Sequence, residues 1–248
     1  LSLKDYESHG GLVGLRKAIT QSGTDIVSEI TASGLRGRGG AGFPAGIKWK
    51  TVLDAQADQK YVCCNADEGD SGTFADRILI EADPFTLIEG MTIAAVAVGA
   101  TQGFVYLRSE YPTAIKRLRD AIEIAKSAGI LGSSVLGSVH TFNLEVRVGA
   151  GSYVCGEETA MLESLEGKRG VIRSKPPLPA IAGLFGKPTI INNVLTLASV
   201  PAIMADGAAA YAARGTGRSL GTQVFQLAGN IARGGIIETA FGVTLETL

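Results

Sequence analysis

Glycines concentrate in one short segment and restrict what that segment can fold into. Residues 33–49 read SGLRGRGGAGFPAGIKW, with five glycines among residues 37–46. Because glycine costs backbone entropy in a helix or strand, this composition predicts a loop. Small residues let backbone N–H groups approach an anion, and Arg38 and Lys48 add positive charge on either side. We therefore expect an anion-binding loop, with a purely structural turn as the alternative.

Residues 37–42 match the pattern G-x-G-x-x-G, but their context is not that of an ordinary dinucleotide-binding loop. The ordinary motif follows a strand, opens a helix and precedes an acidic residue by about 20 positions. Here a helical pattern comes before the loop, Pro44 follows closely, and the next acidic residues are too near or too far. The motif of P-loop nucleotide hydrolases does not occur in the sequence either.

The distribution of apolar residues predicts an α/β fold. Hydrophobic residues make up 46% and charged residues 19% of the 248 residues, which provides for a large core and excludes a disordered chain. Strand patterns alternate with helical periodicity, as in a largely parallel sheet flanked by helices. We expect strands at 61–64, 104–107, 142–148 and 223–229, and helices within 12–32, 83–99, 156–165 and 192–213 and from 111 onward.

The termini and the uncharged runs bear on where the protein lies. The start, LSLKDYESHG, contains no secretory signal, and the end, FGVTLETL, stops in mid-pattern, so we expect a fragment of a longer chain. The uncharged run 90–107 contains Gly99, Thr101 and Gly103, which favour a buried helix, a turn and a strand over a membrane span. A net charge of -1 gives no sign of a nucleic-acid surface. We expect a cytoplasmic protein with no nucleic-acid partner and no membrane insertion.

An acidic segment, CCNADEGDSGTFADR at 63–77, follows the first predicted strand. Ligands bind at the carboxyl ends of strands in open α/β sheets, so this segment lies where a site is expected. Its carboxylates Asp67, Glu68 and Asp70 lack the spacing of a calcium-binding EF-hand loop. They suit the hydroxyls and ring N–H groups of a cofactor, and a solvated turn is the alternative.

A second glycine-rich turn at 149–156 leads into a predicted helix that starts with Glu157 and Glu158. Carboxylates at a helix N-terminus interact favourably with the helix dipole, so capping alone explains them. They also place negative charge where a reactive ring could sit. Asn192 and Asn193, at a predicted loop-to-helix step, are likewise either caps or ligands.

Cysteine and histidine give no support for a metal site or a histidine-based hydrolase. Cys63, Cys64 and Cys155 lack metal-ligand spacing, and three thiolates cannot complete a four-cysteine cluster. We expect these thiols to be reduced and buried, and we expect no metal ligands. His9 and His140 are the two histidines, and neither lies in a motif.

Three segments together resemble one flavoprotein family. GLRGRGGAGFPAGIKW, CNADEGDSGTFADR and GSYVCGEETAMLESLEGKRG are similar to the NADH-oxidising flavoprotein subunit of respiratory complex I and to diaphorase subunits of NAD-reducing hydrogenases and NAD-dependent formate dehydrogenases. The similarity extends over nearly the whole chain. Residues 175–194 and 225–235 most resemble the formate dehydrogenase diaphorase (beta) subunit. The resemblance implies an FMN-dependent NAD(H) oxidoreductase that exchanges single electrons with iron–sulfur centres.

The resemblance also implies roles for individual residues. Those carried over to the FMN phosphate and ribityl chain are Gly37, Arg38, Gly39, Lys48, Asn192 and Asn193. Those for the polar side of the flavin are Asn65, Asp67 and Glu68, and those beside its ring are Tyr153, Gly156, Glu157 and Glu158. Those for NADH are Phe43, Asp70, Glu158 and Lys175. Glu157 and Glu158 would tune the flavin and place the nicotinamide.

Three positions depart from the family pattern. Thr51 and Leu178 stand where complex I subunits carry phenylalanines that stack on adenine, and Asp70 replaces a longer glutamate. We therefore expect weaker adenine stacking, with Phe43 as the remaining aromatic platform.

The resemblance divides the chain into two parts. Residues 1–217 would form a Rossmann-like domain that binds FMN and NAD(H) through an atypical glycine-rich loop, and 218–248 would start a truncated β-grasp domain. The family's 4Fe–4S cluster would lie beyond this chain. Implied partners are iron–sulfur subunits, including a thioredoxin-like 2Fe–2S subunit. A flavin-free NAD-binding dehydrogenase and a non-catalytic assembly subunit are the alternatives.

Overall fold

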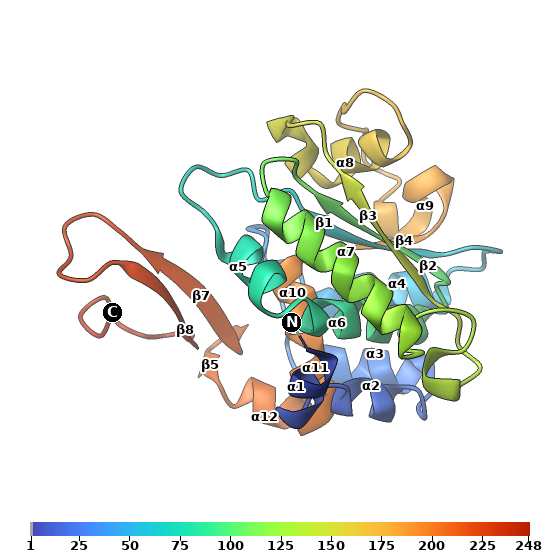
Figure 1. Cartoon of the computed structure of the whole chain (residues 1–248), viewed down its shortest axis with the longest axis horizontal. Helices are drawn as coiled ribbons and strands as arrows, with labels where there is room; N and C mark the ends of the chain where they lie inside the picture. The colour runs from blue at the N-terminus through green and yellow to red at the C-terminus, as the bar shows by residue number, and fades with distance from the viewer. Residues whose placement is uncertain (1) are drawn as a thin grey trace.

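A computed structural model describes residues 2–248 and centres on a four-stranded parallel sheet (Figure 1). The strands are β1 (Tyr61–Ala66), β2 (Gln102–Leu107), β3 (Asn143–Val148) and β4 (Thr189–Asn193), in the spatial order β3-β2-β1-β4. Parallel neighbours require crossover connections, which helices supply here. The expected α/β fold with a Rossmann-like parallel sheet is confirmed.

Helices fill the crossovers and cover the sheet. The connection from β1 to β2 forms α5 (Ala75–Ala82) and α6 (Pro84–Val98), and the connection from β2 to β3 forms α7 (Pro112–Ser127), which crosses the sheet in Figure 1. The connection from β3 to β4 forms α8 (Glu158–Leu165) and α9 (Pro179–Ala182). Within residues 2–248, no helix combines the length and apolar character needed to cross a bilayer.

The remaining helices lie before β1 or after β4. They are α1 (Leu3–Ser8), α2 (Val13–Ala18), α3 (Gly23–Ala32), α4 (Ala45–Asp54), α10 (Val194–Ala198), α11 (Val200–Asp206) and α12 (Ala208–Ala212). Short 3-10 turns occur at Val135–Gly137, Tyr153–Gly156 and Leu184–Gly186.

The strands separate two hydrophobic cores. Successive side chains of a strand point to opposite faces, so neighbouring residues enter different cores. Cys64 and Ile190 join the larger core with the helices α2, α3, α4, α6 and α7, whereas Cys63 and Ile191 join a smaller one with Met161 of α8. All three cysteines are free and buried, as expected.

The C-terminal segment leaves the main sheet and forms two small antiparallel pairs. β5 (Gly215–Thr216) pairs with β6 (Ser219–Leu220), and β7 (Thr222–Leu227) pairs with β8 (Gly235–Ala240). The β7–β8 hairpin stands to one side of the sheet and its helices (Figure 1). The strand expected from 223 is thus present. That this hairpin starts a β-grasp domain stays a prediction.

The sequence-based elements differ from the structure at several places. Asn192 and Asn193 end strand β4, so the expected helical segment 192–213 begins only at Val194. Helix α4 starts at Ala45, inside the segment 33–49 expected to be loop throughout, directly after Pro44 in extended conformation, and it includes Gly46. Helix α5 lies within and beyond the acidic segment, and α1 was not expected.

Candidate functional site

The polar residues of the expected site meet at the carboxyl ends of β1 and β4. The chain proceeds from β1 to β2 and β3 on one side, while β4 lies on the other side of β1. This change of direction is the place where open α/β sheets bind ligands. Asn65 of β1 pairs in register with Asn193 of β4, so two of the predicted residues lie side by side.

Two adjoining cavities open at this point, with volumes of about 1090 Å³ and about 460 Å³. Both are lined by Gly39, Asn65, Gly156, Glu157 and Asn193. The larger cavity extends along the acidic segment toward β7, and the smaller one extends along α4 and α9. Their sizes match those of small-molecule and cofactor sites.

The glycine loop folds back on itself and approaches β4. Its base is closed by hydrogen bonds from Gly37 N to Phe43 O at 2.9 Å and from Ala45 N to Leu35 O at 2.9 Å. Gly40 takes a φ of +108°, which residues with side chains rarely adopt. A Cβ atom at Gly39 would come within 3.0 Å of the Asn193 Cβ. A side chain at Gly39 would therefore press against the strand end that the loop backbone passes.

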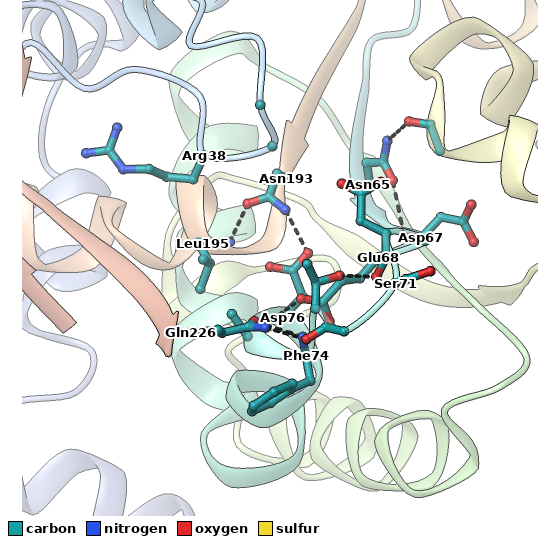
Figure 2. Close-up of a pocket in the computed structure, with 18 of the residues that line it drawn as sticks. Arg38, Asn65, Asp67, Glu68, Ser71, Phe74, Asp76, Asn193, Leu195 and Gln226 are labelled. Atoms are coloured by element: carbon teal, nitrogen blue, oxygen red, sulfur yellow. Dashed lines mark hydrogen bonds between the residues drawn. The ribbon is translucent and has the colours of Figure 1, made fainter. Parts of the chain in front are cut away.

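The asparagine pair is held by side chains from two other elements. Trp49 of α4, fully buried, donates its ring N–H to Asn192 Oδ1 at 2.9 Å. Asn193 Oδ1 caps α10 by accepting from Leu195 N, and its Nδ2 donates to Asp76 Oδ2 at 2.7 Å (Figure 2). Capping and cavity lining therefore occur together at Asn193.

Asp76 was not among the predicted site residues. It is 5% exposed and lines the larger cavity. Burial, together with the negative charge of Glu68, raises its pKa to about 8. In the sequence, Asp76 is one more acid at the end of the polar segment 63–77, and nothing local shows that it lies in the first turn of a helix and is buried.

Four charged side chains form a cluster in the smaller cavity. Lys175 Nζ donates to Glu157 Oε1 at 2.9 Å and to Glu158 Oε1 at 2.8 Å, and Lys48 Nζ lies 3.5 Å from Glu158 Oε2. Against the effect of desolvation, the hydrogen bonds to the two glutamates raise the pKa of Lys175. Desolvation lowers the pKa of Lys48. All four residues were predicted for the FMN or NADH site.

Glu157 also caps helix α8. Its Oε2 accepts hydrogen bonds from Thr159 N at 2.8 Å and Ala160 N at 2.9 Å. Against desolvation, these bonds and those from the Thr159 hydroxyl and Lys175 lower the pKa of Glu157. The capping alternative thus holds for Glu157, and the same carboxylate faces the cavities through its other oxygen.

The acidic segment contributes one unpaired carboxylate oxygen. Among the described residues, Asp67 Oδ2 is buried without a hydrogen-bond partner, and burial raises the pKa of Asp67 to about 6. Glu68, by contrast, accepts from the backbone N–H groups of Asp76 and Arg77 at the start of α5. Asp70 accepts a hydrogen bond from the Tyr153 hydroxyl at 2.8 Å.

Two predicted residues are placed apart from the rest. Arg38 lines the larger cavity, but its side chain points away from Asn193 toward the C-terminal segment (Figure 2). Asp70 lies in the larger cavity, whereas the other predicted NADH residues, Phe43, Glu158 and Lys175, line the smaller one. Thr51 and Leu178 also line the smaller cavity, beside Phe43.

Residues 30–202 match the family model described as the Nuo51 FMN-binding domain. The chain belongs to this family. Among curated proteins, it is 51% identical over 245 residues to HndC, a component of the NADP-reducing hydrogenase of Solidesulfovibrio fructosivorans. It is also 51% identical over 247 residues to a subunit of the NADH-quinone oxidoreductase of Rhizobium meliloti strain 1021.

These alignments cover 99% of this chain in both cases, but 50% and 59% of the two relatives. The chain therefore spans little more than half of their length. Among solved structures, the H2-reduced NAD+-reducing [NiFe]-hydrogenase has a chain 43% identical in sequence, with a TM-score of 0.85. That match covers 92% of this chain and 38% of the hydrogenase chain.

The residues at the two cavities fit FMN. The unpaired Asp67 oxygen is suited to accept from a ring N–H or a hydroxyl, because an unpaired buried carboxylate is costly. The glycine loop offers backbone N–H groups for a phosphate. Lys48 adds a positive charge to the lining of the smaller cavity, beside Glu158.

Proposed function

We propose that this chain is the FMN- and NAD(H)-binding part of a diaphorase, an enzyme that exchanges hydride with NAD(H) and single electrons with iron–sulfur centres. One observation carries the proposal. Two adjoining cavities lie at the point where the strand order reverses, between β1 and β4. They are surrounded by the glycine loop, Asn193, Asp67 and the ion cluster of Glu157 and Lys175. The family to which the chain belongs supports FMN as the cofactor.

The larger cavity would hold the ribityl chain and phosphate of FMN. Gly39 and Asn193, which line both cavities, would contact the phosphate end, with Gly37 and Asn192 approaching it from the smaller cavity. Asn65, Asp67 and Glu68 would face the polar side of the ring. Arg38 would hold the glycine loop in place, because its guanidinium is engaged by the C-terminal segment and its backbone N–H by Thr196 of α10. These roles rest on the placement of the residues around the cavity.

The smaller cavity would receive the dinucleotide. Phe43 and Leu178 offer apolar surface for the adenine, and Lys175 offers a cation for the pyrophosphate. Tyr153, Gly156, Glu157 and Glu158 would lie beside the ring, where they orient the nicotinamide. When bound, FMN supplies a ring that accepts a hydride and releases electrons one at a time. Hydride transfer depends on close stacking, so these residues position the reactants rather than carry protons.

The setting of the module is part of the proposal. The hydrogenase and NADH-quinone oxidoreductase relatives favour either of those complexes, at 51% identity each. A formate dehydrogenase rests only on the sequence similarity of residues 175–194 and 225–235. In any of these settings the electrons would leave through a 4Fe–4S cluster outside this chain and a thioredoxin-like 2Fe–2S partner subunit.

A flavin titration tests the proposal. The 248-residue chain mixed with FMN should show the flavin absorbance at about 450 nm, lose it on addition of NADH, and reduce ferricyanide. Trp49, the one tryptophan of the chain, is bonded to cavity residue Asn192 and should be quenched by bound FMN. A protein that stays colourless and unquenched after reconstitution would reject the proposal in favour of a flavin-free dehydrogenase or an assembly subunit.

A further inference from the structure

The C-terminal hairpin forms one wall of the larger cavity. Residues of β7, including Val224, Phe225 and Gln226, line this cavity opposite the acidic segment and the glycine loop. The hairpin belongs to neither the main sheet nor its helices. The expected boundary at 217 therefore does not separate the cofactor site from the segment that follows it.

Gln226 ties the hairpin to the acidic segment. Its Oε1 accepts a hydrogen bond from Phe74 N at 2.8 Å, and its Nε2 donates to Gly72 O at 2.7 Å (Figure 2). One side-chain amide thus satisfies two backbone groups at the tip of the segment. Gly72 has a φ of +81°, and Thr73 N bonds to Asp70 O, so the tip is a tight turn. Its position depends on what holds it from outside.

Arg38 ties the same hairpin to the glycine loop. Its Nε donates to Thr222 O at 3.1 Å and its Nη2 donates to Leu220 O at 2.9 Å. The guanidinium also lies 4.9 Å from the centre of the Phe241 ring, just beyond β8. The side chain therefore contacts both strands' flanks at the open end of the hairpin, while its backbone N–H bonds to Thr196 Oγ1 of α10 at 2.8 Å.

We infer that the β7–β8 hairpin is a positioning element of the cofactor site, and that Gln226 is its positioning residue. The hairpin holds the acidic segment and the glycine loop at a fixed separation across one cavity. Loops pay conformational entropy when a ligand orders them, and prior fixation reduces that cost. The inference rests on the proposed function, since it concerns FMN binding between these two loops.

By thermodynamic linkage, FMN binding and the ordering of the hairpin favour each other. If the ordered hairpin favours FMN binding, bound FMN must stabilise the hairpin by the same factor. The hairpin amides of residues 222–240 should therefore exchange hydrogen more slowly with FMN than without it. This protection should pass through Gln226 and should weaken when its side chain is removed.

Hydrogen exchange and FMN titration of the 248-residue chain test the inference. Gln226→Ala removes both bonds to the acidic segment and should raise the FMN Kd about tenfold, equivalent to about 1.4 kcal/mol. The FMN-dependent protection of residues 222–240 should fall with it. The KM for NADH should rise several-fold, because the acidic segment is placed less well. The kcat per bound flavin should stay within about twofold, because the stacking of the nicotinamide on the flavin does not change.

Thr239→Ala is the matched control on the same hairpin. Thr239 pairs across the hairpin with Gln223, and it is outside the lining of both cavities in the part of the chain that the structure describes. FMN affinity and protection should match those of the unmodified chain. A larger effect of Thr239→Ala than of Gln226→Ala would overturn the role of Gln226.

The outcomes separate the inference from the proposed function. FMN that binds the unmodified chain without slowing exchange in 222–240 would overturn the inference and leave the proposed function in place. A chain that binds no FMN at all would reject both. Should Gln226→Ala fail to fold, the exchange of the unmodified chain with and without FMN decides the matter alone.

Discussion

Glu157 both caps helix α8 and forms an ion pair with Lys175, so a substitution that keeps its shape tests the role of its charge. One oxygen caps α8 and the other accepts from Lys175. Glu157→Gln keeps an amide oxygen for the cap but removes the ionic partner of Lys175. Lys175 then loses one of the two carboxylates that hold it beside the smaller cavity, so we expect its misplacement to raise the KM for NADH by about tenfold, equivalent to about 1.4 kcal/mol.

FMN should remain bound to Glu157→Gln with its Kd changed less than about threefold. Stopped-flow bleaching of the flavin by NADH measures the effect, and far-ultraviolet circular dichroism verifies the fold. Rates equal to those of the unmodified chain would show that Glu157 acts only as a helix cap.

The raised pKa of Asp76 should make the stability of the protein depend on pH. Its pKa is raised from an ordinary value near 3.8 to about 8 by burial and Glu68. Between these values the native state holds a proton that the unfolded state has lost, so the free energy of unfolding falls as pH rises. Asp76→Asn cannot ionise, and its amide oxygen can still accept from Asn193.

The stability of Asp76→Asn relative to the unmodified chain should therefore increase from pH 4 to pH 8. We expect a gain of at least about 1 kcal/mol, since one pKa unit corresponds to about 1.36 kcal/mol. Urea unfolding of the flavin-free protein at several pH values gives the difference. A constant difference across this range would show that Asp76 is ionised with an ordinary pKa.

Single residues also show what the sequence predicts about the site and what it does not. Glycines and acids next to strand ends identify Gly39, Asp67 and Glu157, because loop chemistry is local. The side chains that hold other site residues in place have no local motif. Trp49 bonds to Asn192 and Gln226 bonds to Phe74, and each pair is more than 100 residues apart in sequence. The direction of the Arg38 side chain likewise depends on the distant residues 220–222.

At the scale of elements, helix α6 carries a buried acid that holds the N-terminal segment. Glu89 is 1% exposed and accepts hydrogen bonds from Leu12 N at 2.8 Å and Leu15 N at 2.9 Å, as well as from the Tyr6 hydroxyl. Leu12 has a φ of +66°, an uncommon conformation for a leucine. The carboxylate therefore provides the N-terminal turn with a fixed acceptor for two backbone donors.

Glu89→Gln should lower the free energy of unfolding by about 2–3 kcal/mol. The amide retains one oxygen, so one buried N–H loses its acceptor and faces an NH2 group instead. Chemical denaturation measures the loss. Tyr6→Phe, which removes one donor and leaves the carboxylate bonded to the backbone, should cost about 1 kcal/mol; an equal cost for both would contradict this account.

Elements with a clear period or a strong terminus are predictable from sequence, and the others are not. Helix α6 has Asp83 as its N-cap, Pro84 in its first turn and Gly99 after its end, so its limits agree with the expected 83–99. Strand β4 is short, and its pairing partner Tyr61–Asn65 lies far away in sequence. The local pattern therefore assigns its last two residues to the next helix, although Asn193 is in fact the cap of that helix.

At the scale of the whole molecule, the proposed cofactor joins five separate parts of the chain. The cavities are lined by the glycine loop, the acidic segment, the start of α8 and the end of β4, and the larger one also by β7. A ligand that binds the native state alone stabilises it by about 2.7 kcal/mol at 100 times its Kd. For a chain of this size, about 1 kcal/mol shifts the Tm by about 2–4 °C.

FMN at 100 times its Kd should therefore raise the Tm of the chain by roughly 5–10 °C, and each further tenfold increase should add about half as much, about 1.4 kcal/mol. Differential scanning calorimetry at several FMN concentrations gives the dependence, with riboflavin as the matched control. Riboflavin lacks the phosphate that the glycine loop would bind, so its effect at equal concentration should be much smaller. Equal shifts with both flavins would contradict a phosphate site at Gly39 and Asn193, and a Tm independent of FMN would contradict flavin binding altogether.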